Sequence, residues 1–290
     1  MSRRTPPMVL QAFDSNAFGD GAVLGCDFVG EVVELGRSAS RLAKGDIVAG
    51  LVWGGEIKGL GGYSQYCVAD GRISFKVPAS VSHAEASTVP LACATAWLAL
   101  FSKDCLRLDR VKDKGTSVLV WGGSSSVGLY TIQLASMYDL DVVTTCSPRH
   151  ADLVRSYGAK HVFDYKDVDV VEKIKQAAPS LQHIFDTIGN PISSITASHA
   201  LRSGGTLCTV RPGKAHTETV AAGTRVTDVL ASPDDHELCA ELFEMLPAWL
   251  DQGVVRPSHP KIYHGLDTVP EGFREYRDGK ISAYKIVYEV

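Results

Sequence analysis

The sequence predicts an α/β protein in which a doubly wound parallel sheet is joined to a smaller β-rich domain. From residue 117 to residue 210, short apolar runs alternate with helical segments, which is the pattern of parallel βαβ units. The first 90 residues instead contain short, glycine-bounded runs typical of an antiparallel barrel or sandwich. The length of 290 residues is sufficient for one large or two ordinary domains.

The β-rich part is expected to contain three strands before residue 70. Apolar or alternating runs predict them at 28–35, 46–52 and 63–68. A helical pattern begins near residue 83, where Ser82 and Glu85 have the spacing of a capping box. Residues 84–89 and 91–101 are therefore expected to be helical.

The alternating part predicts five strands and four helices. The strands are expected at 117–121, 141–146, 161–165, 184–186 and 206–210, and the helices at 127–140, 151–157, 170–178 and 195–201. A further helix is expected at 238–250. The last strand-like segment, 283–290, is expected to return to the β-rich domain.

Composition excludes several classes of protein. With 45% hydrophobic and 21% charged residues, the chain can bury a core, so disorder is not expected. A net charge of -4 argues against a nucleic-acid partner. There is neither an apolar run of membrane-spanning length nor a secretory leader, so we expect no membrane. Seven cysteines without a C-x-x-C motif indicate free thiols and a cytoplasmic location.

The strongest chemical signal is a glycine-rich loop, Gly122-Gly-Ser-Ser-Ser-Val-Gly128, between a predicted strand and a predicted helix. Relative to G-x-G-x-x-G it is degenerate, with Gly123 first, Ser125 second and Gly128 third. Small residues let the backbone approach a pyrophosphate, and a helix N-terminus offers free N–H groups. The alternative interpretation is a tight βα turn that binds nothing.

The end of the second predicted strand indicates which dinucleotide binds. An NAD site favours a carboxylate there, to hold the ribose 2′-hydroxyl. The sequence has Ser147-Pro-Arg-His150 instead. Arginine suits a 2′-phosphate because its fork donates two hydrogen bonds. The sequence therefore predicts NADPH over NADH. A solvated loop with a surface arginine is the alternative.

Two other chemistries are not expected. The nine histidines form neither H-x-x-x-H nor H-E-x-x-H, so no zinc site is predicted. No G-x-S-x-G follows a strand, and no Asp–His pair is spaced to serve a serine nucleophile.

An ordered set of motifs carries a family resemblance. The motifs are GCDFVGEV at 25–32, GGYSQY at 61–66, ASTVPLACATA at 86–96, GGSSSVG at 122–128, CSP at 146–148, GAKHVFDY at 158–165 and GKISAYK at 279–285. Together they resemble the zinc-independent branch of the medium-chain dehydrogenase/reductase superfamily. Within it, the chain is most similar to fungal trans-acting enoyl reductases of the lovastatin type and to quinone oxidoreductases.

This resemblance implies a GroES-like catalytic domain, residues 1–98 plus 239–290, with an inserted Rossmann domain at 99–238. It implies NADPH as cofactor, in a cleft between the two domains. The implied cofactor-binding residues are Ser124, Ser125, Ser126, Val127, Ser147, Pro148, Arg149, His150, Tyr165, Val210, Arg211, Ile281 and Ser282. The implied substrate channel is lined by Val89, Pro90, Leu91, Ala92, Cys93, Ala94, Thr95 and Ala96.

Two departures from the superfamily pattern matter. Zinc-dependent members carry G-H-E where this chain has Gly25-Cys26-Asp27, and the later cysteine ligand is replaced by Leu91. The cluster of structural cysteines is also missing, so no metal is expected. In addition, only 24 residues precede Gly25, and the N-P-x-D stretch of family members is not among them. The N-terminus is therefore expected to be shortened.

The implied activity is NADPH-dependent reduction of the C=C bond of an α,β-unsaturated carbonyl, acting in trans in polyketide biosynthesis. The substrate would be a small-molecule or carrier-bound enoyl compound, and a polyketide synthase the partner. Thr95 and backbone N–H groups of the channel are the candidates to stabilise the enolate, and the proton donor is unassigned. Alternatives are a quinone reductase and a non-catalytic NADPH-binding subunit, which a shortened N-terminus favours. A monomer and a homodimer both fit.

Overall fold

The structure is a computed structural model that describes residues 2–3, 21–37, 41–55, 57–210, 219–229 and 236–290. The chain divides into two compact units, which we call unit 1 (Met1–Ala92 with Asp234–Val290) and unit 2 (Cys93–Pro233). The sequence placed the corresponding divisions at 98/99 and 238/239.

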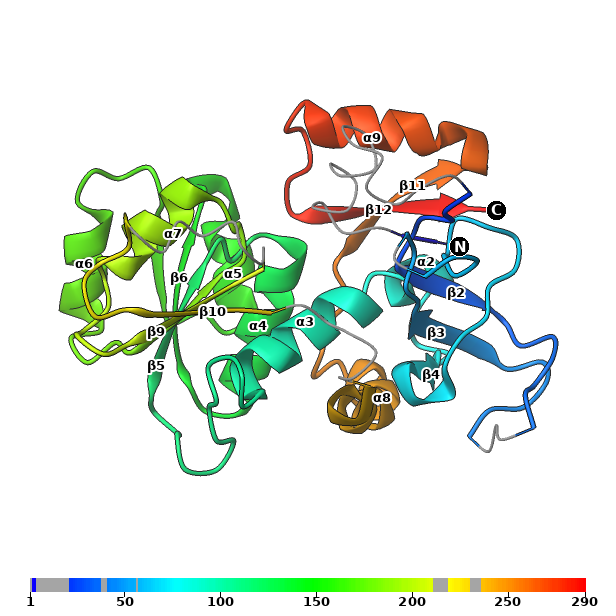
Figure 1. Cartoon of the computed structure of the whole chain (residues 1–290), viewed down its shortest axis with the longest axis horizontal. Helices are drawn as coiled ribbons and strands as arrows, with labels where there is room; N and C mark the ends of the chain where they lie inside the picture. Colours follow the sequence, from blue (N-terminus) through cyan, green and yellow to red (C-terminus); the bar gives the residue numbers. More distant parts are fainter. Residues whose placement is uncertain (1, 4–20, 38–40, 56, 211–218, 230–235) are drawn as a thin grey trace. The chain divides into compact units, whose positions relative to one another are not determined.

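Unit 1 is built on a six-stranded sheet of order β11-β12-β1-β2-β3-β4. Its strands are β1 Ser2–Arg3, β2 Asp27–Glu31, β3 Ile47–Leu51, β4 Ser74–Lys76, β11 His259–His264 and β12 Tyr284–Glu289. Neighbouring strands are antiparallel except β11 and β12, which are parallel. In the sequence, α9, Val269–Arg277, lies between these two strands. The last strand therefore joins the sheet of the first residues, as the sequence predicts (Figure 1).

Two helices pack against strands of this sheet. The predicted capping box is present at α2, His83–Ala86: the Ser82 hydroxyl accepts from the Glu85 N–H, and the Glu85 carboxylate accepts from the Ser82 N–H. Helix α8, His236–Asp251, packs on β4 through the rings of Phe75 and Phe243, whose centroids are 6.2 Å apart. The contact between Phe75 and Phe243 connects the two chain segments of unit 1.

The strand predicted at 63–68 is wrong. The backbone N–H groups of Gly62 and Tyr63 donate to the carbonyls of Gly25 and Leu24, so this segment is held as a loop. Tyr66 and Val68 are exposed at 76% and 72%. Alternating residue types imitated a strand that has no partner, and the real strand, β4, follows after Asp70.

Unit 2 contains a six-stranded parallel sheet of order β10-β9-β8-β5-β6-β7. Its strands are β5 Ser117–Trp121, β6 Asp141–Cys146, β7 His161–Asp164, β8 His183–Asp186, β9 Thr206–Thr209 and β10 Arg225–Asp228. The order is that of the doubly wound Rossmann fold, in which the direction of winding reverses beside the first strand. The predicted fold class is thereby confirmed.

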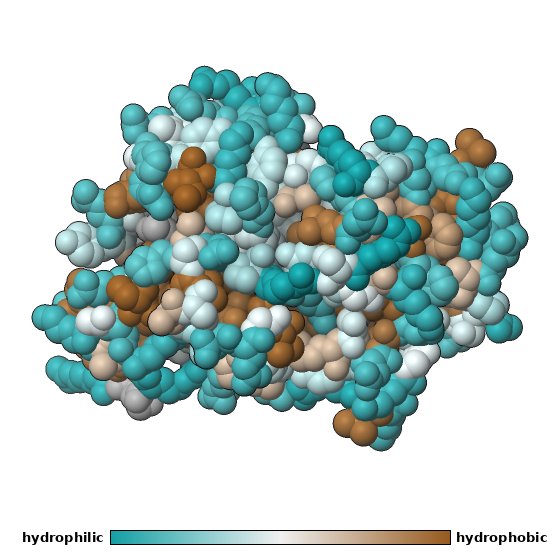
Figure 2. All heavy atoms as spheres, turned by 180° about the vertical axis from the view of Figure 1, so that it is seen from behind, coloured by the Kyte–Doolittle hydropathy of each residue, from teal (hydrophilic) through white to brown (hydrophobic). Residues whose placement is uncertain are grey.

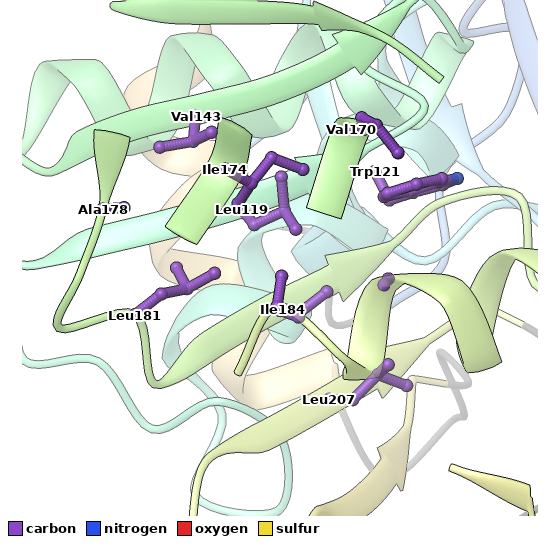
Figure 3. Packing of buried hydrophobic residues seen from close by; sticks show 11 residues of the cluster. Leu119, Trp121, Val143, Val170, Ile174, Ala178, Leu181, Ile184 and Leu207 are labelled. Atoms are coloured by element: carbon purple, nitrogen blue, oxygen red, sulfur yellow. The ribbon is translucent and has the colours of Figure 1, made fainter. Parts of the chain in front are cut away.

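Four helices in the described part of unit 2 alternate with its strands (Figure 1). They are α4 Ser126–Met137, α5 Ala151–Ser156, α6 Val170–Ala177 and α7 Pro191–Ser198. On one face of the sheet, Leu119, Ile184 and Leu207 are fully buried against Ile174 of α6 (Figure 3). Helix α7 begins four residues before the predicted start, because Asn190 caps it and Pro191 occupies its first turn.

One stretch, 83–101, is long and apolar enough to cross a membrane by composition. It comprises α2 and α3, Pro90–Phe101, and 83% of its apolar window is buried in the fold. That burial is typical of a core helix. The surface in Figure 2 shows hydrophilic residues over most of the visible face, with smaller apolar patches among them.

Candidate dinucleotide-binding site

The candidate site lies at the carboxyl edge of the parallel sheet, where β5 ends between β6 and β8. Trp121, the last residue of β5, has Thr145 of β6 and Asp186 of β8 as its neighbours in register. The chain leaves β5 for α4 and leaves β8 for α7 at the same edge. In doubly wound sheets this switch point is where nucleotides bind.

The loop after β5 depends on its glycines. Gly122 has a φ of +85°, which is unfavourable for a residue with a side chain. A Cβ on Gly123 would lie 2.1 Å from the Thr144 hydroxyl, and one on Gly128 would lie 2.4 Å from the carbonyl oxygen of Gly122. The backbone of this loop and the helix that follows it therefore approach each other as closely as the G-x-G-x-x-G pattern requires.

The loop ends in the N-terminus of α4, a helix of 12 residues. Ser125 caps it: its hydroxyl accepts from the Gly128 N–H and its own N–H donates to the Gly122 carbonyl. Among the hydrogen bonds of the described residues, none uses the N–H groups of Ser124, Ser126 and Val127. Three amides at the positive end of a helix form a site for an anion such as a pyrophosphate.

The residues after β6 form a short 3₁₀ turn. Ser147 precedes it, and Pro148, Arg149 and His150 make up the turn. The Arg149 Nε–H donates to the His150 Nε2 at 3.2 Å. Partial burial, and then the charge of Arg149, lower the pKa of His150 below its ordinary value. This shift favours the neutral imidazole, and Arg149 carries a permanent positive charge in this turn.

Tyr165 lies next to this turn. Cys146 and Asp164 are partners in register, so Ser147 and Tyr165 leave adjacent strands side by side. Tyr165 is 44% exposed, and the ammonium of Lys166 lies 5.8 Å from its ring centroid. The structure thus brings the predicted residues 147–150 and 165 together, and it adds a lysine that the sequence analysis did not single out.

The chain was compared with known proteins. Residues 126–229 match the family "Zinc-binding dehydrogenase", and residues 8–79 match "Alcohol dehydrogenase GroES-like domain". A trans-enoyl reductase from Alternaria alternata is 31% identical, over 93% of this chain and 84% of the relative. The chain belongs to the medium-chain dehydrogenase/reductase superfamily. A trans-enoyl reductase from Trichoderma harzianum is 34% identical, over 93% of this chain and 82% of its own.

Solved structures share the fold of this superfamily member. The enoyl reductase CurK superposes with a TM-score of 0.82 at 19% identity, over 99% of this chain and 89% of that one. A quinone oxidoreductase from Coxiella burnetii reaches 0.74 at 22%, over 99% and 83%. Membership in the superfamily makes unit 2 a nicotinamide-dinucleotide domain.

The geometry of unit 2 fits such a cofactor. The glycine loop at 122–128 and the available N–H groups of Ser124, Ser126 and Val127 suit a pyrophosphate. At the end of β9, the Thr209 hydroxyl is 1% exposed and has no hydrogen-bond partner among the described residues. The N–H of Val210, the next residue, donates to the Asp186 carbonyl at 3.2 Å. Arg211 lies outside the described residues.

The remaining predicted residues lie elsewhere. Ile281 and Ser282 precede β12 in unit 1. The predicted channel segment, 89–96, forms the loop end and first turns of α3, and all of it is buried except Thr95, which is half-buried. Its role in lining a channel stays a prediction, as do the cofactor roles of the individual residues.

The positions that the resemblance associates with zinc form a hydrogen-bonded cluster. The two Asp27 carboxylate oxygens accept from the Leu91 N–H at 2.6 Å and from the Lys285 ammonium at 2.7 Å. The Cys26 thiol donates to the Gly54 carbonyl. No group of three or more histidine, cysteine, aspartate or glutamate side chains in the described part of the chain could hold a metal ion.

Sequence reasoning missed three residues around the glycine loop. Thr145 and Thr187 both contact it, and Asp186 is fully buried beside it. The Asp186 carboxylate accepts from the N–H groups of Ile188 and Gly189 and from the hydroxyls of Ser193 and Ser194. Burial raises its pKa, although these hydrogen bonds act in the opposite direction. Polar residues at the ends of buried strands were the available signal.

Proposed function

We propose that this protein is an NADPH-dependent enoyl reductase that reduces the C=C bond of an α,β-unsaturated carbonyl compound. The observation that carries the proposal is the set of bare amides at Ser124, Ser126 and Val127 on the end of α4. Similarity to proteins named trans-enoyl reductases supports the substrate class.

The preference for NADPH rests on the residues after β6. No carboxylate occurs between Ser147 and His150, and Arg149 brings a permanent positive charge. A guanidinium donates two parallel hydrogen bonds to a phosphate, whereas a ribose hydroxyl benefits from a carboxylate. Tyr165 and Lys166 stand on the neighbouring strand end and would close the other side of the 2′-phosphate.

When bound, NADPH supplies a hydride for the β-carbon of the substrate. Negative charge then develops on the carbonyl oxygen, which needs a hydrogen-bond donor, and the α-carbon needs a proton. The Thr95 hydroxyl is our candidate donor, because Thr95 is the half-buried residue in an otherwise buried segment. The amides at the start of α4 hold the pyrophosphate and so fix the position of the nicotinamide.

We also propose the physiological setting. The substrate is a carrier-bound or free enoyl thioester, which suits relatives named trans-enoyl reductases, and the proposed carrier is part of a polyketide synthase. All seven cysteines are free thiols, which suits a reducing compartment such as the cytoplasm. At the position that the resemblance associates with zinc, the Asp27 carboxylate accepts a hydrogen bond from the Lys285 ammonium, and the reaction as proposed uses no metal.

The test is the decay of NADPH absorbance in the presence of the purified chain and a crotonyl or longer enoyl thioester. We expect oxidation of NADPH in proportion to the saturated product. Oxidation with quinones but not with enoyl thioesters would favour the quinone reductase. NADPH binding without oxidation by either substrate would favour the non-catalytic subunit and would contradict the proposed activity.

A further inference from the structure

The backbone of the glycine loop is held from both sides by threonines on the neighbouring strands. On the β6 side, the Thr145 hydroxyl accepts from the Gly122 N–H at 3.1 Å, and its carbonyl accepts from the Gly123 N–H at 2.9 Å. On the β8 side, the Thr187 hydroxyl lies 2.8 Å from the Trp121 carbonyl and 2.9 Å from the Gly122 carbonyl. Both peptide units at the start of the loop are thus held at both ends.

Thr187 also reaches the helix cap. The Ser125 hydroxyl donates to the Thr187 oxygen at 2.8 Å, and the same Ser125 oxygen accepts from the Gly128 N–H. One hydroxyl therefore connects the end of β5 with the first turn of α4. Thr187 is 7% exposed, so these contacts are made away from water.

The direction of these bonds matters for an anion. A loop of two glycines and three serines has many backbone conformations available, and serine hydroxyls compete for backbone groups. A peptide unit that turned over would present its carbonyl oxygen where a phosphate needs an N–H. The Thr187 hydroxyl, whose one proton is shared between them, keeps the carbonyls of residues 121 and 122 on the protein side, and the Thr187 N–H also donates to the Trp121 carbonyl at 3.1 Å. The N–H groups of Gly122 and Gly123, in the same two peptide units, are bound by Thr145, so the turn that leads to the N–H groups of Ser124, Ser126 and Val127 has a fixed start.

The segment that carries Thr187 is itself fixed. Asp186 accepts four hydrogen bonds, two of them from the N–H groups of Ile188 and Gly189. A Cβ on Gly122 would lie 2.6 Å from the Ile188 side chain, so the two loops are in close contact. The turn after β8 therefore acts as a rigid support for the loop after β5.

We propose that Thr187 is a positioning residue of the dinucleotide site, which sets the affinity for NADPH by orienting the glycine loop without contacting the cofactor. The proposal rests on the proposed function of the same site. It names a residue that follows β8, whereas the glycine loop follows β5. Thr145 performs the matching task from β6.

The test uses the 290-residue chain and the fluorescence of bound NADPH. Thr187→Val keeps the shape and removes the hydroxyl, and we expect the Kd for NADPH to rise about tenfold, as for the loss of one buried hydrogen bond. Thr187→Ser keeps the hydroxyl and should bind within about twofold of wild type. Thr206→Val is the matched control at the opposite end of the sheet, with unchanged Kd.

A second readout separates positioning from folding. In turnover assays Thr187→Val should raise the KM for NADPH by a larger factor than it lowers kcat. A purely structural role would lower the urea midpoint of the apo-protein and leave the Kd unchanged, which would overturn the proposal. If Thr187→Val does not fold, Thr145→Val decides, with the same expected rise in Kd. A wild-type chain that binds no dinucleotide would overturn the proposed function as well, whereas equal binding by wild type and variant would overturn only the role of Thr187.

Discussion

The Lys285 ammonium donates to the Asp27 carboxylate across 2.7 Å in the interior of unit 1, where neither side chain is more than 6% exposed. Lys285 also donates to the Thr88 carbonyl, and the Ser258 N–H donates to the Thr88 hydroxyl. The pair therefore connects β2, β12 and the start of α3. Each charge would be costly to bury without the other.

Removal of one partner should therefore destabilise unit 1 strongly. We expect Lys285→Met to lower the free energy of unfolding by about 3–5 kcal/mol, because it leaves the Asp27 carboxylate buried and uncompensated. Asp27→Asn together with Lys285→Met should recover part of that loss. Lys280→Met, which breaks an exposed pair with Asp278, is the control, with an expected loss below about 1 kcal/mol. Urea denaturation followed by circular dichroism measures all three. Equal losses for Lys285 and Lys280 would contradict the account.

Arg149 should determine the choice between the two dinucleotides. Arg149→Ala removes the charged donor of the 3₁₀ turn, so we expect NADPH affinity to fall roughly 10- to 100-fold, the range of hydrogen bonds to charged groups. NADH affinity should change by less than about twofold. Calorimetric titration with both cofactors measures this. Arg155→Ala, on the exposed side of α5, is the control. An equal loss for NADPH and NADH would show that Arg149 does not bind the 2′-phosphate.

Gly128→Ala should abolish the close approach of α4 to the loop. Alanine favours a helix over glycine by about 1 kcal/mol, so intrinsic propensity alone predicts no harm. The added Cβ, however, would lie 2.4 Å from a backbone carbonyl oxygen that cannot move aside freely. We expect weaker binding of NADPH and NADH alike, by at least about tenfold. Gly30→Ala, in open space, should bind both normally. Unchanged affinity in Gly128→Ala would show that cofactor binding does not depend on the close approach of α4 to the glycine loop.

The pH dependence of stability in unit 1 should depend on Glu275. Its burial raises the carboxyl pKa, but hydrogen bonds from Lys261, Tyr263 and Tyr284 outweigh burial, and the pKa is lowered below 4.5. The unfolded chain then binds this proton more tightly than the folded chain. The stabilisation is therefore complete above pH 4.5 and is lost as the pH falls through the lower, folded-state pKa.

Glu275→Gln should remove this part of the acid dependence, whereas Glu271→Gln, on the same helix but exposed, should keep it. Urea midpoints between pH 3 and pH 6 give the comparison. A wild-type chain whose midpoint does not fall more steeply than that of Glu275→Gln would contradict the assignment.

The elements that sequence reasoning found are those with a local signal. β5 and β6 have the predicted bounds, because continuous apolar runs are interrupted by turn residues at both ends. β10, β11 and α9 were not predicted. The segments of β10 and β11 are polar or half-exposed, and His259–His264 contains a proline, so only pairing with β9 or β12 makes these two segments strands. That pairing joins residues distant in sequence.

The candidate site shows the same division. The loop 122–128 and the turn 147–150 can each be recognised from a sequence pattern of a few residues. The structure places both at one edge of the sheet. Thr145 and Thr187 carry only the weaker signal of polar residues at the ends of buried strands, because their role depends on the register of β6 and β8 against β5. Ser125 is a different case. Its residue type was recognised, but its hydroxyl serves as a helix cap and a link to Thr187.

The most direct test of the central claim is an equilibrium titration of the wild-type chain with NADPH and with NADH, followed by nicotinamide fluorescence. We expect saturable binding of one NADPH per chain, at least about tenfold tighter than NADH, because β6 is followed by an arginine and by no carboxylate. Absence of saturable binding, or equal affinity for the two cofactors, would contradict it.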